Sequence, residues 1–165
     1  MIYTIRKHTH RARPVRIGLY IGGKVITKQV TFKPSCRYYL NPEDQQDVNK
    51  LFGIGYLWSH HRNSARFGWR YNEVTDRIEL FAYCYIRGHR GIVPITAVQI
   101  GEKITCRLTA MRHGEYNFEV TREDGSYTYK AVKKPQHGWI GFPLGIYFGG
   151  NKTAPESIKI EMIKL

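Results

Sequence analysis

The segment that most constrains the fold of this chain is an unbroken alternation of residue types from Arg77 to Arg87. One face carries small and apolar side chains, namely Ile78, Leu80, Ala82, Cys84 and Ile86. The other face mixes aromatic rings with charges of both signs, namely Arg77, Glu79, Phe81, Tyr83, Tyr85 and Arg87. A period of two over this length predicts a β-strand with one face in the core. The second face is typical of the floor of a polar binding groove, so we expect one sheet to present such a groove.

Similar alternation runs through most of the remaining sequence, with turn signals in between. The predicted strands are 2–6, 15–21, 25–33, 51–59, 65–71, 77–87, 91–100, 103–112, 116–121, 126–132, 139–148 and 157–163. Only the region 42–49 favours a short helix, because Asn41 suits an N-cap and Pro42 suits a first turn. Asp124-Gly125 predicts a hairpin. Short strands with at most one short helix predict an all-β fold, a two-sheet antiparallel β-sandwich of jelly-roll type, as a single domain over residues 1–165.

The charge balance favours acidic partners. The chain has 26 Lys and Arg against 13 Asp and Glu, a formal net charge of +13. No acid precedes Glu43, and none lies between Val48 and Asn72. We therefore expect an acidic polysaccharide or another polyanion as partner, with a merely solvated basic surface as the alternative. Nucleic acid is less favoured, because the sequence has neither an RNP-like nor a helix-turn-helix pattern.

The cysteines and the termini carry little specific information. Cys36, Cys84 and Cys106 are an odd number with wide spacing, and Cys84 and Cys106 occupy apolar strand positions, which favours reduced, buried thiols without excluding one disulfide. No apolar run has the length of a signal peptide or a membrane span. We expect an intracellular or virion-associated protein rather than a secreted one. No metal-ligand spacing and no cofactor motif is recognisable, so we expect neither a metal nor a cofactor.

The segment 58–71 is the densest in functional side chains, with two histidines, three arginines and several aromatic residues. Arginine fits carboxylate or sulfate in bidentate fashion, and Trp or Tyr rings offer a flat surface to a sugar ring. The alternative is a strand pair with a basic outer face and a turn at 60–63. Gly68 inside the strand indicates a bulge or the close approach of another backbone.

From Leu51 onward the chain resembles the jelly rolls of the concanavalin A-like lectin/glucanase superfamily, with its closing run 144–162 similar to their final strands. The segments 63–71 and 77–86 are also similar to an uncharacterised bacterial family of small jelly-roll domains. Within this fold, alginate-lyase-like polysaccharide lyases carry Arg-x-Glu-Leu, Gln-Ile-His and Tyr-Phe-Lys strands. Here Arg77-Ile78-Glu79-Leu80, Val98-Gln99-Ile100-Gly101 and Tyr147-Phe148-Gly149 follow in the same order.

The lyase resemblance implies that Arg77, Glu79, Gln99 and Tyr147 line a groove that holds an acidic sugar. Gly101 stands where those lyases have their histidine, and no tyrosine follows in the region of 153–154. Elimination requires a base and a group that neutralises the enolate. The resemblance therefore implies binding rather than turnover, and we predict no catalytic residue.

Our first hypothesis is a non-catalytic, lectin-like module for an acidic glycan. Arg66, Arg77 and Lys152 would contact acidic groups; Trp69, Tyr83, Tyr85 and Tyr147 would stack on sugar rings; Glu79, Gln99 and Asn151 would bond hydroxyl groups. The second hypothesis is a structural protein of a virus or phage, a capsid-decorating or tail-associated jelly roll that assembles with other proteins or as a homo-oligomer. The third is a polysaccharide lyase or a hydrolase with unrecognised catalytic residues.

Overall fold

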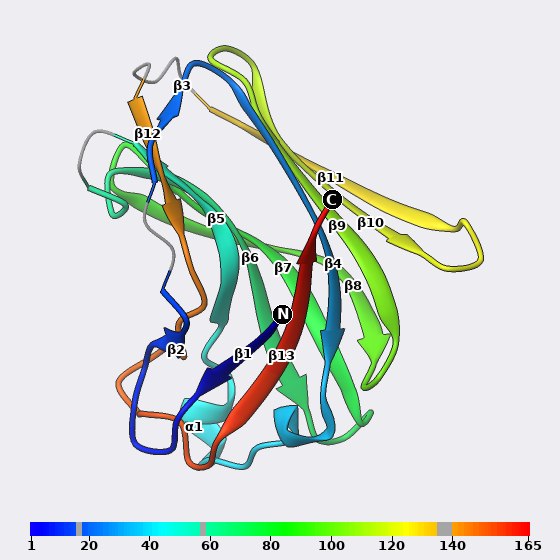
Figure 1. The fold of residues 1–165 in the computed structure, drawn as a ribbon. Coiled ribbons are helices and arrows are strands. Elements are labelled where there is room, and N and C mark those ends of the chain that lie inside the picture. The colour runs from blue at the N-terminus through cyan, green and yellow to red at the C-terminus, as the bar shows by residue number, and fades with distance from the viewer. Residues whose placement is uncertain (16–17, 57–58, 135–139) are drawn as a thin grey trace.

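A computed structural model describes residues 1–15, 18–56, 59–134 and 140–165, and shows two antiparallel sheets packed face to face (Figure 1). The seven-stranded sheet has the order β11 (Tyr127–Lys133), β10 (Glu115–Arg122), β9 (Lys103–Ala110), β4 (Lys24–Phe32), β13 (Ile158–Lys164), β1 (Ile2–Ile5), β2 (Ala12–Arg13). The six-stranded sheet has the order β3 (Tyr20–Ile21), β12 (Ile140–Leu144), β5 (Asn49–Tyr56), β6 (Asn63–Asn72), β7 (Arg77–Ile86), β8 (His89–Gln99). The predicted all-β sandwich is confirmed.

The core lies between the two sheets and follows the alternation of the strands. In β7 the apolar face predicted from the sequence is buried from Ile78 to Cys84 and partly buried at Ile86, while Arg77 at the start of the strand is exposed. The neighbouring strand β6 contributes Phe67, Trp69 and Tyr71 to the same core. The ring of Trp69 has 0% exposure and lies 5.4 Å from the ring of Phe32 on the opposite sheet. These large side chains hold the two layers together through buried apolar surface.

A helix forms at the place predicted from Asn41, but it ends at Gln45, and residue 49 of the predicted region 42–49 already belongs to β5. Helix α1 spans Pro42–Gln45, and the Asn41 side chain accepts a hydrogen bond of 2.8 Å from the backbone N–H of Asp44. A short 3₁₀ helix, η1, spans Pro34–Cys36 and was not predicted. The predicted hairpin at Asp124-Gly125 joins β10 to β11, with Gly125 at a φ of 83° that favours glycine.

Two predicted strands are shorter than expected. Of the predicted 15–21 strand only Tyr20–Ile21 forms β3, and residues 16–17 lie outside the described residues. The predicted strand 139–148 is β12 only as far as Leu144, and residue 139 also lies outside the described residues. Beyond Leu144 the chain leaves β12, and Tyr147 instead makes isolated bridges to Arg11 and Lys50. This departure from regular pairing positions the Tyr147 side chain described below.

The three cysteines are free and buried. Burial raises the pKa of Cys84 to about 12, so its thiol stays protonated at neutral pH. Within the described parts of the chain, no helix has the length and apolar character needed to cross a membrane.

Candidate functional site

The pairing of β6 with β7 brings together the central residues of the candidate site. Arg66 is opposite Tyr83, and Ser64 is opposite Tyr85. Because neighbouring residues on a strand point to opposite faces, Arg66 and Tyr83 share the outer face of the six-stranded sheet, while Phe67 and Ala82 face the core. The mixed face of β7 therefore lies outside the main core.

A β-bulge brings Lys50 to this outer face. In the pairing of β5 with β6, Lys50 is opposite Gly68 and Phe52 is opposite Phe67, so Leu51 is the extra residue. Without the bulge, Lys50 and Phe52 would point to the same side, because they are two residues apart. The bulge allows Phe52 to enter the core while Lys50 lies on the outer face. Gly68, where we predicted a bulge or a close approach, lies opposite this irregularity.

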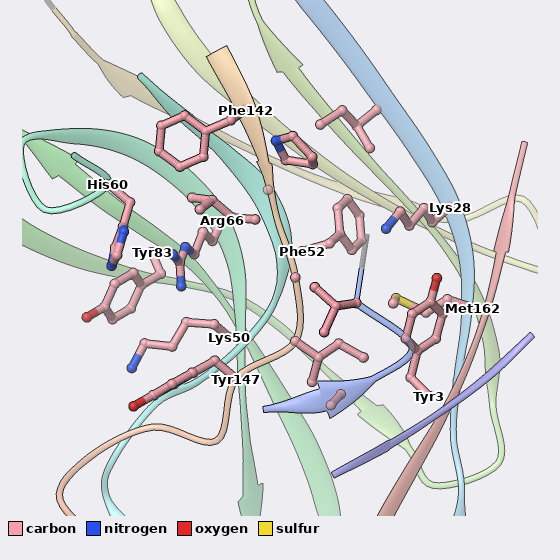
Figure 2. A pocket seen from close by; sticks show the side chains of 18 of the residues that line it. Tyr3, Lys28, Lys50, Phe52, His60, Arg66, Tyr83, Phe142, Tyr147 and Met162 are labelled. Carbon is pink, nitrogen blue, oxygen red and sulfur yellow. The ribbon is translucent and has the colours of Figure 1, made fainter. Parts of the chain in front are cut away.

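Tyr147 completes an aromatic frame around the Lys50 ammonium group (Figure 2). The Lys50 Nζ lies 4.8 Å from the ring centroid of Tyr83 and 5.9 Å from that of Tyr147. On its other side, the Tyr147 ring stacks on His10, with centroids 5.0 Å apart and an interplanar angle of 8°. These contacts are favourable cation–π and stacking geometries. The lysine and both tyrosine rings are therefore held in fixed positions.

Two histidines lie beside these residues, in the turn between β5 and β6. The rings of His60 and His61 have centroids 4.1 Å apart, and His61 makes an edge contact with Tyr85 at 5.2 Å. The carbonyl of His60 accepts a hydrogen bond of 2.6 Å from the hydroxyl of Ser64, which anchors the turn to β6. We use the term Arg66 site for six residues that line one cavity: Lys50, His60, Arg66, Tyr83, Tyr85 and Tyr147.

The Arg66 site carries positive charge that forms no ion pair among the described residues, although Asp47 acts on Lys50 from a distance. Arg66 is only 8% exposed, and the ion pairs found between described residues include neither Arg66 nor Lys50. Burial lowers the pKa of Arg66 to about 10, and burial together with Arg66 lowers the pKa of Lys50 to about 8. Burial and the same guanidinium lower the pKa of His60 to about 4. An anion bound here would relieve this repulsion.

The structure brings together four of the ten predicted site residues: Arg66, Tyr83, Tyr85 and Tyr147. Tyr83 is 5% exposed, in a small cluster with Val48 and Phe81 that is separate from the main core. The prediction for Trp69 is corrected, because its ring is completely buried between the sheets and offers no face to a ligand. Trp69 and Arg66 are three residues apart on one strand, so they point to opposite faces.

The other predicted residues lie away from the Arg66 site. Arg77 pairs with Gln99 at the far end of β7, six residues and thus about 20 Å from Tyr83. Glu79 is engaged by neighbours, since it accepts hydrogen bonds of 2.9 Å from Arg70 Nε and 2.8 Å from Asn72 Nδ2. The groove implied by the lyase resemblance, in which Arg77, Glu79, Gln99 and Tyr147 meet, is therefore not formed.

Asn151 and Lys152 are exposed in the chain between β12 and β13, and neither is among the described residues that line the cavity. Gly101, which stands where the lyases have a histidine, lies in the turn after β8 with a φ of 88°. No group of three potential metal ligands is found in the ranges that the structure describes.

Lys50 was not predicted as a site residue from the sequence, and His60 was given no role. His60 and His61 lie in the segment 58–71 that we identified as dense in functional side chains, but adjacency alone does not show which side chain faces Arg66. No local sequence pattern identifies Lys50 as a site residue, because its orientation depends on the bulge at Leu51. Both residues join the site through pairing between strands.

The lowered pKa of Lys50 predicts how stability depends on pH. The ordinary value of 10.5 applies to the unfolded chain, and the folded value is about 8. Between these values the unfolded state binds more protons, so the free energy of unfolding rises with pH. Because the ammonium keeps partial contact with water, we expect a gain of about 1 to 2 kcal/mol from this group.

Urea unfolding of the wild type and of Lys50→Met between pH 7 and 10 measures this contribution. The charged groups that act on Lys50 are Arg66, Asp47 and Arg90, and both proteins contain them. Burial raises the pKa of Tyr83 to about 12, beyond this range. The difference between the two curves therefore removes the contributions that the two proteins share. We expect the wild type to gain stability relative to Lys50→Met as the pH rises. Parallel curves would show that Lys50 is not desolvated.

Comparison with known proteins supports the fold. No protein-family model and no curated protein matches the sequence. A functionally unknown protein from Saccharomyces cerevisiae is similar in structure, with a TM-score of 0.54 and 9% identity over 90% of this chain and 73% of that one. An alginate lyase from Alteromonas sp. 272 has a TM-score of 0.50 and 10% identity over 100% of this chain and 87% of that one.

The GH43B protein of a Bacteroides ovatus xyloglucan PUL has a TM-score of 0.53 and 8% identity. The match covers 94% of this chain but only 29% of that protein. At such low identity these similarities show a common fold, and they do not show a common activity. The chain therefore has the architecture of jelly-roll β-sandwich proteins, in agreement with the expected concanavalin A-like sandwich.

Proposed function

We propose that this protein is a non-catalytic module that binds an acidic carbohydrate at the Arg66 site. The observation that carries the proposal is the nearly buried guanidinium of Arg66, which has no ion pair with a described residue and lines a cavity beside Lys50, Tyr83, Tyr85 and Tyr147. Burying an unpaired charge costs free energy. A carboxylate of the ligand would offset this cost by forming a bidentate pair with Arg66.

A sugar acid fits this site better than a simple anion. The half-buried rings of Tyr85 and Tyr147 offer apolar surface to a pyranose ring and phenolic groups to its hydroxyls, while the nearly buried Tyr83 ring supports Lys50. The structural neighbours include an alginate lyase and a protein of a xyloglucan PUL, which supports a carbohydrate ligand for this fold. Polyuronates combine rings, hydroxyls and carboxylates in one chain.

Binding without turnover is favoured by the composition of the site. The described residues that line the cavity include neither aspartate nor glutamate. Glycoside hydrolysis ordinarily needs two carboxyl groups that flank the scissile bond. The glycine at the position of the lyase histidine, Gly101, is in a distant turn. Both observations favour a binding protein over a hydrolase or an alginate-type lyase.

Isothermal titration calorimetry tests the proposal. Oligomannuronate, oligogalacturonate and oligoglucuronate are titrated at 20 and 150 mM salt, with neutral cello-oligosaccharide and poly-glutamate as controls. We expect at least one oligouronate to bind at both salt concentrations, and the neutral sugar not to bind. Poly-glutamate should bind weakly and lose its affinity at 150 mM, because net charge alone is screened. If poly-glutamate binds as well as every oligouronate, or if no oligouronate binds even at 20 mM, the proposal is wrong.

A further inference from the structure

The cavity that contains the Arg66 site continues past strand β12 to the space between the two sheets. Its volume is about 700 Å³, and its lining comes from both sheets. Figure 2 shows two groups of side chains on either side of β12. Arg66, Lys50, His60, Tyr83 and Tyr147 lie on one side, and Phe52, Tyr3, Met162 and Lys28 lie on the other. We use the term inner chamber for the part lined by Tyr3, Ile26, Lys28, Phe52, Ile146 and Met162.

The inner chamber contains the apolar side chains of Ile26, Phe52, Ile146 and Met162 beside Tyr3 and Lys28, and Lys24, Thr27 and Lys164 also line the cavity. Phe52 is 1% exposed and Met162 is 3% exposed, and both are among the residues that line the cavity. Protein interiors are otherwise packed as densely as organic crystals. The ammonium of Lys28 lies 4.5 Å from the centroid of the Phe52 ring. A concave surface of this kind accommodates an apolar group of a ligand.

The two parts of the cavity meet where the chain leaves β12. Leu144 is paired with Gly53 and faces the Arg66 side, whereas Ile146 belongs to the main core. Gly145 lies between them, lines the cavity and is exposed. No atom comes within 4 Å of a Cβ added at Gly145. Apart from its chain neighbours Leu144 and Ile146, no atom of a described residue therefore occupies the space on the Cβ side of Gly145.

We propose that the ligand is amphiphilic: an acidic sugar at the Arg66 site with an alkyl or acyl chain in the inner chamber. This inference rests on the proposed function and adds the second half of the ligand. Its basis is the continuity of one cavity, with unpaired charge at one end and buried apolar side chains at the other. The volume falls within the range of sites for discrete small molecules. The class of ligand is thus an alkylated or acylated uronic acid glycoside.

Calorimetry with four ligands below their critical micelle concentrations tests this inference. They are octyl β-D-glucuronide, methyl β-D-glucuronide, octyl β-D-glucoside and octanoate. Each buried methylene adds favourable transfer free energy, so we expect the octyl glucuronide to bind at least tenfold more tightly than the methyl glucuronide. We expect it to bind at least tenfold more tightly than the octyl glucoside, which lacks the carboxylate. Octanoate should be weaker than the octyl glucuronide, because it has no sugar ring for the tyrosines.

A variant and an NMR signal test where the alkyl chain of the ligand binds. Gly145→Trp should remove most of the advantage of the octyl group while leaving methyl glucuronide binding within threefold. Gly91→Trp is the matched control, because a Cβ at Gly91 also meets no atom within 4 Å and Gly91 does not line the cavity. In protein with ¹³C-labelled methionine methyl groups, octyl glucuronide should shift the methyl resonance of Met162, which lines the inner chamber. The methyl resonance of the exposed Met111 should stay unchanged.

The outcomes separate this inference from the proposed function. If oligouronates bind but the octyl and methyl glucuronides have equal affinity, the amphiphilic ligand is excluded and the binding of acidic sugars stands. If octyl glucoside or octanoate binds as tightly as octyl glucuronide, the inference that one ligand uses both the Arg66 site and the inner chamber is wrong. If Met162 does not shift when octyl glucuronide binds, the chain does not enter the inner chamber, and the inference is overturned.

Discussion

Arg66→Gln is expected to weaken the binding of an oligouronate by about 30-fold or more. Loss of one partner from a buried, hydrogen-bonded charge pair typically costs about 2 to 5 kcal/mol. The guanidinium is 8% exposed, so its pairing with a carboxylate would be poorly screened by water. Glutamine keeps a hydrogen-bond donor but removes the charge. Calorimetric titration of wild type and variant with the same oligouronate measures the loss.

Arg77→Gln is the matched control. Arg77 lies on the same face of the same sheet but at its far end, and its side chain is exposed. The two variants have the same net charge, so a general electrostatic attraction would weaken equally in both. We expect Arg77→Gln to change the affinity by less than threefold. An equal loss in the two variants would assign binding to net charge rather than to the Arg66 site.

Arg66→Gln should keep the protein folded. Burial lowers the pKa of the Arg66 side chain, which means that the folded state disfavours its charge. Removing the charge is therefore expected to leave the free energy of unfolding within about 1 kcal/mol of the wild type, or to raise it. A urea unfolding curve checks this. Loss of affinity with unchanged stability would identify a residue retained for binding at some cost in stability.

Gly53→Ala is expected to destabilise the fold strongly. Gly53 lies opposite Arg66, on the strand β5 that follows the bulge. A Cβ at this position would overlap the carbonyl oxygen of Ala65 and lie 2.7 Å from the Arg66 Cα. Both obstacles are backbone atoms of β6, so only a displacement of the strand relieves the clash. We expect a loss of about 3 kcal/mol or more, and a Tm lower by about 6 to 12 °C.

Gly91→Ala is the control for the loss of glycine itself. Gly91 is on the edge strand β8, and a Cβ there meets no atom within 4 Å. Its substitution should leave stability unchanged or raise it by up to about 1 kcal/mol, because alanine restricts the unfolded chain. Thermal and urea unfolding of both variants provide the comparison. A Gly53→Ala protein as stable as Gly91→Ala would mean that β5 and β6 are not this close.

The predicted jelly-roll sandwich followed from local patterns. The alternation from Arg77 to Arg87 indicated both the strand and the face that lies outside the main core. Because side chains on a strand alternate with a period of two, Arg66 and Tyr83 could be assigned from sequence alone to the faces that lie outside the main core, although both side chains are nearly buried there. The same rule, applied to the spacing from Arg66 to Trp69, assigns Trp69 to the core. Trp69 was wrongly predicted to stack on a sugar ring, because the residues were grouped by chemical type instead of by the sheet face on which they lie.

The composition of the site depended on pairing between distant segments. Tyr147 reaches Lys50 through an isolated bridge, and His10 reaches Tyr147 from the N-terminal region. These contacts join residues about 100 to 140 positions apart, and no local pattern encodes them. The separation of Arg77 and Gln99 from Tyr147 likewise follows from where each strand pairs. The short motifs that this sequence shares with the alginate-lyase-like lyases occur in the same order, but they do not form a common groove here.

The sequence alone determined that this chain forms an antiparallel β-sandwich with a basic, aromatic outer face, because alternation and charge are local properties of each strand. Only the tertiary structure decided that Lys50 joins Arg66 on that face and that Trp69 does not. The physical reason is that one extra residue in β5 reverses which side chains point outward, and this bulge exists only in the pairing of β5 with β6.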